Sequence, residues 1–176
     1  MHLSLIRAAT EADLQRLVVV EVEAGQVFRT VGMSKVAEDV PQIPELREAV
    51  AAERLWVTEV GSEVAGYVTA EVLDGNAHVA QVSVAPDYAG RALGRAMIEF
   101  VEEWGRAAGR PATTLTTFRD VPWNGPYYLR LGYRVLPEEH VGPELARTMA
   151  HEASLPGIDA SLRCAMVKSN PATGRT

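Results

Sequence analysis

The chain has 176 residues, a hydrophobic content of 47% and a formal net charge of −6. This length suits one domain with a sizeable core, and an acidic balance without a basic stripe argues against nucleic-acid binding. No apolar run approaches the ~20 residues needed to cross a bilayer, and the N-terminus lacks a secretory pattern, so we expect no membrane partner. The single cysteine, Cys164, excludes an internal disulfide and favours a cytoplasmic location.

The elements can be predicted in chain order from apolar periodicity and turn residues. Seven short runs predict strands, at 3–6, 55–60, 64–73, 78–84, 112–118, 133–136 and 162–167. Helical spacing predicts helices at 10–25, 45–53, from 91 until Gly109, around 127–131, and at 143–153. The pattern predicts an α/β (α+β) fold, one domain over residues 1–168 with a mixed central sheet of about seven strands flanked by helices. Residues 169–176 are predicted to form a disordered tail.

The first helix has the clearest start signal. Thr10 followed three residues later by Asp13 forms a partial capping box. The buried stripe of this helix is predicted to contain Leu14, Leu17, Val18 and Val22. A looser segment, 30–44, is predicted to separate it from the second helix.

A strand, a tight turn and a long amphipathic helix follow one another between His78 and Arg106. Pro86 ends the strand because it has no N–H to donate to a neighbour. The first helical turn carries the small residues Gly90, Ala92 and Gly94, interleaved with arginines. Backbone N–H groups at such a helix start have no intrahelical partner and lie at the positive end of the helix dipole. The stretch therefore predicts an anion cradle suited to a pyrophosphate.

The residues V-S-V-A-P-D-Y-A-G-R-A-L-G-R-A-M resemble the acyl-CoA signature of the GNAT superfamily of N-acetyltransferases. That signature, Q/R-x-x-G-x-G/A, falls on Ala89 to Gly94, with Ala89 in place of Gln or Arg and Ala92 in place of Gly. Downstream, Y-L-R-L-G-Y at 128–133 is similar to the family pattern Y-x-K-x-G-F. The two blocks and the order of elements extend the resemblance over residues 3–168.

The resemblance implies acetyl-CoA as co-substrate, with no metal. It implies a splayed pair of parallel strands whose free backbone groups, at Val82, Ser83 and Val84, take the pantetheine arm. The Val84 N–H would polarise the thioester carbonyl. The pyrophosphate would be held by Gly90, Arg91, Ala92, Leu93, Gly94 and Arg95. Asn124 is expected to contact pantetheine, or else to cap a helix that has Pro126 just inside it.

The resemblance makes Tyr128 the candidate general acid, because it occupies the family tyrosine position. Its neighbour Tyr127 is the rival, and the alternative for Tyr128 is a core aromatic with its hydroxyl on a backbone carbonyl. The base is expected at His78, where the histone-modifying branch of the superfamily places a glutamate; a histidine titrates near ~6.5. The alternative for His78 is a surface residue after the turn at 74–76.

The acceptor is expected to be a primary amine, on a small molecule or a protein, that attacks the thioester directly. Glu23 could orient a cationic amine or belong to a solvated helix face. Phe28 and Trp123 could line the acceptor pocket or serve in packing. A homodimer is possible, since the last strands of such folds often form one.

Other chemistries lack their motifs. The sequence has no G-x-x-x-x-G-K-[ST] loop and no G-x-S-x-G elbow, and its four histidines show no metal-ligand spacing. Cys164 is predicted to be buried packing. Two rival hypotheses are a non-catalytic acyl-CoA-binding sensor, motivated by Ala89 and Ala92, and a protein that binds no acyl-CoA.

Overall fold

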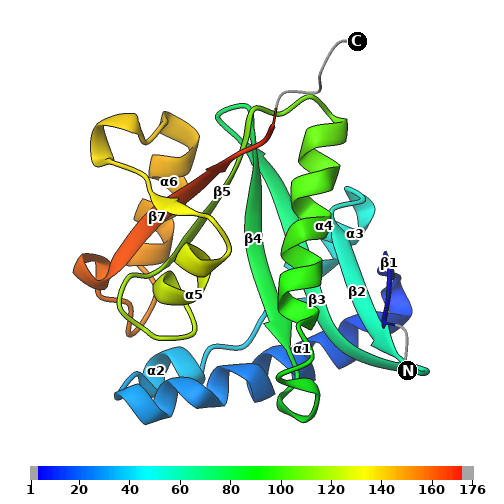
Figure 1. Cartoon of the computed structure of the whole chain (residues 1–176). Helices are drawn as coiled ribbons and strands as arrows, with labels where there is room; N and C mark the ends of the chain where they lie inside the picture. The colour runs from blue at the N-terminus through cyan, green and yellow to red at the C-terminus, as the bar shows by residue number, and fades with distance from the viewer. Residues whose placement is uncertain (1–3, 172–176) are drawn as a thin grey trace. The chain divides into compact units, whose positions relative to one another are not determined.

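The computed structural model describes residues 4–171, which contain a seven-stranded sheet in the order β1-β2-β3-β4-β5-β7-β6 (Figure 1). The strands are β1 Ser4–Ala8, β2 Leu55–Val60, β3 Glu63–Leu73, β4 Asn76–Val84, β5 Ala112–Phe118, β6 Arg134–Val135 and β7 Arg163–Ser169. The α-helices are α1 Leu14–Gly25, α2 Ser34–Ala37, α3 Ile43–Ala51, α4 Leu93–Ala107, α5 Gly125–Arg130 and α6 Pro143–Ala153. The β4–β5 pair is parallel, while β1–β2, β2–β3, β5–β7 and β6–β7 are antiparallel. The predicted α/β fold class, a mixed sheet flanked by helices, is confirmed.

The chain packs as two compact units, and β4 and α4 each contribute to both. The first unit contains the chain up to Ala70 together with Gln81–Glu99. The second contains Glu71–Ala80 and the chain from Phe100 onward. The turn between β4 and α4 therefore belongs to the first unit, and β5, α5, α6 and β7 belong to the second.

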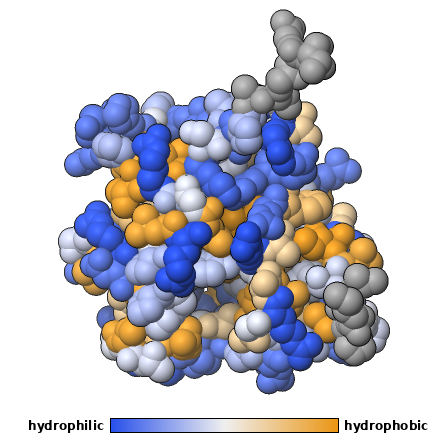
Figure 2. All heavy atoms as spheres, in the orientation of Figure 1, coloured by the Kyte–Doolittle hydropathy of each residue, from blue (hydrophilic) through white to orange (hydrophobic). Residues whose placement is uncertain are grey.

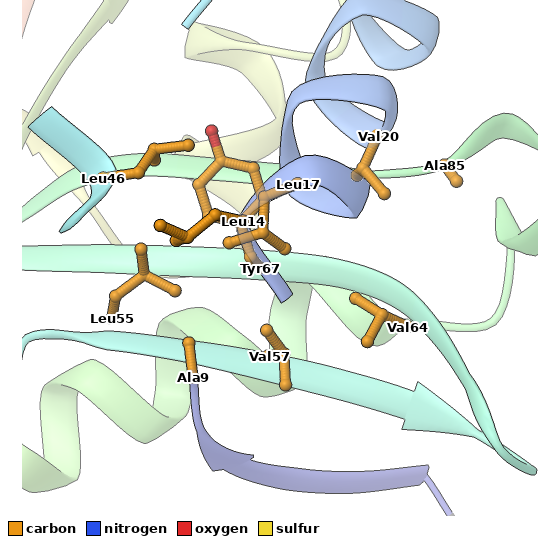
Figure 3. Close-up of a cluster of buried hydrophobic side chains, with 10 residues drawn as sticks. All are labelled: Ala9, Leu14, Leu17, Val20, Leu46, Leu55, Val57, Val64, Tyr67 and Ala85. Atoms are coloured by element: carbon orange, nitrogen blue, oxygen red, sulfur yellow. The ribbon is translucent and has the colours of Figure 1, made fainter. Parts of the chain in front are cut away.

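The core of the first unit is formed by α1 and α3 against β2 and β3 (Figure 3). One cluster of this core contains the ten buried residues Ala9, Leu14, Leu17, Val20, Leu46, Leu55, Val57, Val64, Tyr67 and Ala85. Tyr88, which follows β4, packs partly buried against the same cluster. The core thus holds the chain immediately before the predicted anion cradle.

The start of α1 is fixed by the predicted capping box and by an arginine clamp. The Asp13 carboxylate accepts hydrogen bonds from the Thr10 N–H (2.8 Å) and from the Thr10 hydroxyl (3.1 Å). Arg7 of β1 donates to Asp13 and also to Glu59 of β2. The Arg7 guanidinium, with help from Thr10, holds the pKa of Asp13 below its usual range. The clamp joins β1, the helix start and β2.

In the second unit, the turn between β3 and β4 caps a distant helix. The Asp74 carboxylate accepts from the backbone N–H groups of Glu144 (3.0 Å) and Leu145 (2.9 Å) in the first turn of α6. These are donors that the helix itself leaves without partners, and Gly142, at the N-cap, has no side chain to serve them. Asp74 therefore fixes where α6 begins.

Tyr133, which replaces the phenylalanine of the family pattern, is buried in the second unit. Its hydroxyl donates to Glu102 Oε1 of α4 (2.9 Å), and Lys168 of β7 donates to the other oxygen of the same carboxylate (2.9 Å). The phenolic oxygen has a partner because an unpaired buried hydroxyl would be costly. This substitution is thus accommodated by one polar contact.

Several predicted boundaries need correction. The segment 30–44, predicted to be loose, contains α2, and α3 begins at Ile43, two residues before its predicted start. Val20, not Val22, is the buried valine near the end of α1. Helix α4 begins at Leu93 instead of Arg91. Strand β7 runs to Ser169, and Asn170 hydrogen-bonds to Pro111 and Arg110, so the predicted disorder is wrong at these two residues. The rest of the predicted tail from residue 172 onward lies outside the described part of the chain.

The surface carries hydrophilic residues over much of the visible face, with hydrophobic residues between them (Figure 2). Between residues 4 and 171, no helix combines the length and the apolar character needed to span a bilayer. The same residues contain no cluster of three or more side chains able to hold a metal ion.

Candidate functional site

The turn between β4 and α4 is exposed over residues 89–92. Pro86 begins a short 3₁₀ turn that ends at Tyr88, where the Tyr88 N–H donates to the Ala85 carbonyl (2.9 Å). Gly90 follows with φ +77°, the left-handed region that glycine adopts without strain. A Cβ built on Gly90 would meet no atom within 4 Å, so the space beside this residue is open.

Ala92 also lies in the left-handed region, with φ +58°, at the position where the family signature has glycine. An L-residue with a Cβ is destabilised there by about 1–2 kcal/mol, because the Cβ approaches the following carbonyl oxygen. The turn nevertheless keeps the conformation that the signature glycine would allow. Alanine in place of glycine at position 92 therefore lowers the stability of the turn without changing its backbone conformation.

Helix α4 begins immediately after this turn. The Ala96 N–H donates to the Ala92 carbonyl (3.0 Å), so the amides of Leu93 and Gly94 precede the first intrahelical hydrogen bond. The Leu93 side chain is buried, and only its backbone can serve a ligand. Amides at the positive end of a 15-residue helix suit an anion with several oxygens.

Two arginines flank these amides. The Arg91 guanidinium lies over the Tyr88 ring, 5.3 Å from its centroid, and the Arg95 Nε donates to Glu99 (2.7 Å). Both side chains are exposed. The open space at Gly90, the helix amides and the two cations lie close together in the sequence, between residues 90 and 95. Diphosphate binding by these residues stays a prediction, and Arg91 and Ala92 belong to the turn and not to the helix.

Along the last residues of β4, the backbone N–H and C=O groups of successive residues point alternately toward the two neighbouring strands. The Ala85 N–H donates to the Ala65 carbonyl of β3 (2.8 Å), and a Cβ on Gly66 of β3 would lie 2.5 Å from the Ser83 carbonyl oxygen. Ser83 and Ala85 thus face β3. By alternation, the N–H group of Val84 faces away from β3.

The parallel ladder with β5 runs from Ala77 to Val79 of β4, so it ends before Val82. Val82 and Val84 lie beyond this ladder with backbone groups directed away from β3. Ser83 differs, because its carbonyl faces β3 and its hydroxyl accepts from Gln81 Nε2 (3.0 Å). Pantetheine binding by Val82, Ser83 and Val84 stays a prediction.

His78 lies in β4 with 1% of its surface exposed, so the alternative of a surface histidine is wrong. Its Nδ1 is 2.8 Å from the Thr114 hydroxyl of β5. Burial lowers the pKa of His78 to about 4, because the charged ring would lose its hydration. The imidazole is therefore neutral near pH 7 and able to accept a proton, although it is a weak base.

Tyr128 lies on α5 and is 8% exposed. Its ring makes edge-to-face contacts with Tyr127 (centroids 5.5 Å apart) and Tyr133 (6.1 Å). Burial and then the neighbouring Tyr127 raise the pKa of Tyr128 to about 12, while Arg163 acts in the opposite direction. The phenol thus keeps its proton near pH 7 and can donate it. The alternative, a hydroxyl held by a backbone carbonyl, stays open.

Asn124 precedes α5, and its backbone carbonyl accepts from the Tyr128 N–H (3.0 Å). Asn124 is the N-cap residue of α5 and Pro126 lies just inside the helix, as the alternative predicted, but the Asn124 side chain makes no capping hydrogen bond. The Nδ2 group donates to the Trp123 carbonyl (3.3 Å), while the buried Oδ1 has no hydrogen-bond partner among the described residues. A buried amide oxygen without a partner is energetically unfavourable, and an amide N–H of pantetheine would satisfy it.

The three residues predicted to meet the acceptor lie in different elements. Glu23 is on α1, with 48% of its side chain exposed and Arg16 Nη1 3.9 Å from its carboxylate. Phe28 is partly buried in the 3₁₀ helix Gln26–Val31 of the first unit. Trp123 is partly buried in the loop before α5, in the second unit. Their acceptor roles stay predictions.

Two further polar residues of interest were not predicted from the sequence. Glu21 of α1 has a carboxyl group whose pKa is raised to about 7, first by burial and then by the charges of Asp39 and Glu45. Its spacing of seven from Leu14 and four from Leu17 places it on the apolar stripe, and that spacing could have revealed it. Thr114, the partner of His78, could not be identified in this way, because the residues of one strand do not show its register with a neighbouring strand.

The described residues thus combine a mixed α/β sheet that contains a parallel strand pair, a left-handed turn and a helix start with amides that have no intrahelical partner. The sequence profile described as the acetyltransferase (GNAT) family matches residues 31–133. The chain therefore belongs to the GNAT acetyltransferase family.

Solved structures share the fold at low identity. The PaiA N-acetyltransferase of Thermoplasma acidophilum, in complex with coenzyme A, is 15% identical with a TM-score of 0.72, covering 95% of this chain and 99% of that one. The ribosomal-protein-S18-alanine N-acetyltransferase of Escherichia coli is 14% identical with a TM-score of 0.68, covering 99% and 98%. The N-acetylglutamate synthase of Neisseria gonorrhoeae, complexed with coenzyme A and N-acetyl-glutamate, is 12% identical with a TM-score of 0.72, covering 97% and 36%.

Proposed function

We propose that this protein is an N-acetyltransferase that moves the acetyl group of acetyl-CoA to a primary amine by direct attack. The observation that carries the proposal is the turn at 89–95, where Gly90 and Ala92 both adopt left-handed backbone before a helix of 15 residues. Membership of the GNAT family supports acyl transfer in general. Coenzyme A in similar structures supports the choice of donor.

The thioester carbonyl becomes more negative as the amine attacks, and a fixed donor lowers the barrier. In the proposed mechanism the Val84 N–H donates to this oxygen. The amine, which titrates near ~10 as an ammonium, must first lose a proton. We assign its acceptance to His78, directly or through water, and we assign to Tyr128 the donation of a proton to the departing thiolate. The amide groups at 90–95 hold the diphosphate throughout.

The acceptor is a primary amine on a small molecule or on a protein, and Glu23, Phe28 and Trp123 are the proposed contacts for it. The net charge of −6 favours a cationic acceptor, since opposite charge raises its local concentration. The single cysteine is typical of a protein of the reducing cytoplasm, which is where we propose that it acts.

A second candidate function is a non-catalytic acyl-CoA sensor. The observation that favours it is the burial of His78, which makes the ring a weak base. Such a protein would keep the diphosphate turn and the Asn124 contact but would lack turnover.

Calorimetry with acetyl-CoA, followed by free-thiol release across a panel of amines, separates the two functions. The acetyltransferase binds acetyl-CoA and releases CoA with at least one amine. Binding without thiol release from any amine, including peptide N-termini and polyamines, supports the sensor. Absence of any binding heat contradicts both.

A further inference from the structure

The buried pair of His78 and Thr114 is set by the register of the parallel strands. Position 78 of β4 lies opposite position 114 of β5, and their neighbours at 77 and 79 pair in step with 113 and 115. Both side chains are almost fully buried, with 1% and 2% of their surfaces exposed. The ring Nδ1 and the hydroxyl oxygen are 2.8 Å apart, which is a good hydrogen-bond distance.

The direction in which the Thr114 hydroxyl donates its proton determines which nitrogen of the His78 ring is protonated. Thr114 Oγ1 also lies 3.4 Å from the Ala77 carbonyl oxygen, in a direction that suits donation. If the hydroxyl donates to Ala77, its lone pair accepts from an Nδ1–H group, and two hydrogen bonds form. If it donates to Nδ1, the bond to Ala77 is lost and a proton sits on Nε2. The first arrangement forms one more buried hydrogen bond than the second, so it is favoured.

We propose that Thr114 is a positioning residue that holds His78 as the Nδ1–H tautomer and so leaves Nε2 free to accept a proton. This inference rests on the proposed role of His78 as the base. Thr114 touches no reacting atom in this scheme and acts only through the imidazole. A hydrogen bond at one ring nitrogen commonly fixes the tautomer at the other.

The tautomer can be read directly by nuclear magnetic resonance. In protein labelled with ¹⁵N at histidine, couplings between ring carbon-bound protons and the two nitrogens show which nitrogen carries the proton. We expect Nδ1–H for His78 in the wild-type chain and in Thr114→Ser, because serine keeps the hydroxyl. In Thr114→Val we expect a shift toward Nε2–H, since Nδ1–H would then have no acceptor.

The kinetic expectation follows from the same geometry. Thr114→Val should lower kcat about tenfold, the effect of losing roughly one hydrogen bond of 1.4 kcal/mol, while KM for acetyl-CoA stays within about twofold. Thr114→Ser should restore kcat. The matched control is Thr113→Val, the same change at the adjacent buried threonine, whose hydroxyl donates to Asn170 Oδ1 (3.3 Å). It should change neither the tautomer nor kcat.

Two results would overturn the inference: an Nε2–H tautomer in the wild-type chain, or a Thr114→Val variant that loses activity with the tautomer unchanged. The wild-type measurement needs neither a variant nor turnover, so it stands even if Thr114→Val fails to fold. The base role itself fails separately, when His78→Gln keeps full turnover.

Discussion

The two compact units contain different kinds of predicted site groups. In the first unit, the diphosphate turn at 89–95 consists of backbone amides beside small side chains, and it keeps its path although alanine stands at two signature positions. In the second unit, the groups with proposed roles are the buried side chains of His78 and Tyr128 and the buried Oδ1 atom of Asn124. A site made of main chain tolerates side-chain replacement that leaves φ unchanged, whereas a site made of buried polar groups depends on every atom. The predictions below test that contrast.

The largest effect is expected at Tyr128. Tyr128→Phe removes the proposed acid but keeps the ring that packs against Tyr127 and Tyr133, so kcat should fall at least ~100-fold while acetyl-CoA affinity stays within about twofold. Steady-state kinetics and calorimetry measure the two quantities. Tyr127→Phe is the matched control and should retain kcat. Unchanged turnover in Tyr128→Phe would remove the acid role.

The next effect is on the free energy of unfolding, which Glu21 and His78 should make depend on pH in opposite directions. Glu21 has a pKa raised to about 7, so its contribution to the free energy of unfolding falls as pH rises from about 4.5 to 7. His78 has a pKa lowered to about 4, so its contribution is present above pH 6.5 and is lost as pH falls toward 4. Each shift corresponds to roughly 3 kcal/mol.

Urea unfolding at several pH values between 4 and 7 checks both signs. Glu21→Gln should make stability rise more steeply with pH than in the wild-type chain, because a falling contribution is removed. His78→Gln should do the reverse. Parallel stability curves for the wild type and either variant would contradict the assigned burial of that group.

A smaller effect is expected at Gly90, where a matched control distinguishes the cost of backbone strain from a loss of CoA binding. Gly90→Val places a β-branched residue at φ +77° and should reduce stability by about 1–2 kcal/mol and weaken CoA binding at least about tenfold. Gly75→Val is the matched control, since Gly75 has φ +80° and equally open space within 4 Å. It should show the same loss of stability with CoA affinity unchanged. Equal CoA affinity in both variants would show that the turn does not bind the cofactor.

The smallest effect is expected at Ala92. Ala92→Gly relieves about 1–2 kcal/mol of left-handed strain and adds about 0.5–1 kcal/mol of chain entropy, so the free energy of unfolding should rise by roughly 0.5–1 kcal/mol. The matched control, Ala89→Gly, lies at φ −61° and should only destabilise. Thermal unfolding of the two variants in parallel measures the difference, and equal destabilisation would show that Ala92 is unstrained.

Local sequence signals located the elements well where both ends were marked. Strand β5 and helix α6 have the predicted bounds, because Pro111 precedes the strand and Pro143 begins the helix. Helix α2 was missed, since four residues are too short to show periodicity. The start of α4 was predicted two residues early, because small residues in a left-handed turn resemble those of a first helical turn.

The site was predictable to the extent that it is local in sequence. The turn at 89–95 and the block at 128–133 are continuous segments, so their residues could be named. The burial of His78, its pairing with Thr114 and the unpartnered Oδ1 of Asn124 depend on strand register and loop packing. Such contacts join distant parts of the chain, and residue patterns within one segment contain no information about them.

A crystal structure with coenzyme A tests the central claim most directly. We predict that the diphosphate oxygens lie within hydrogen-bond distance of the backbone N–H groups between residues 89 and 95, with Gly90 and Ala92 still at positive φ. A diphosphate bound elsewhere, or a turn filled by side chains of the protein itself, would contradict the proposed acetyltransferase.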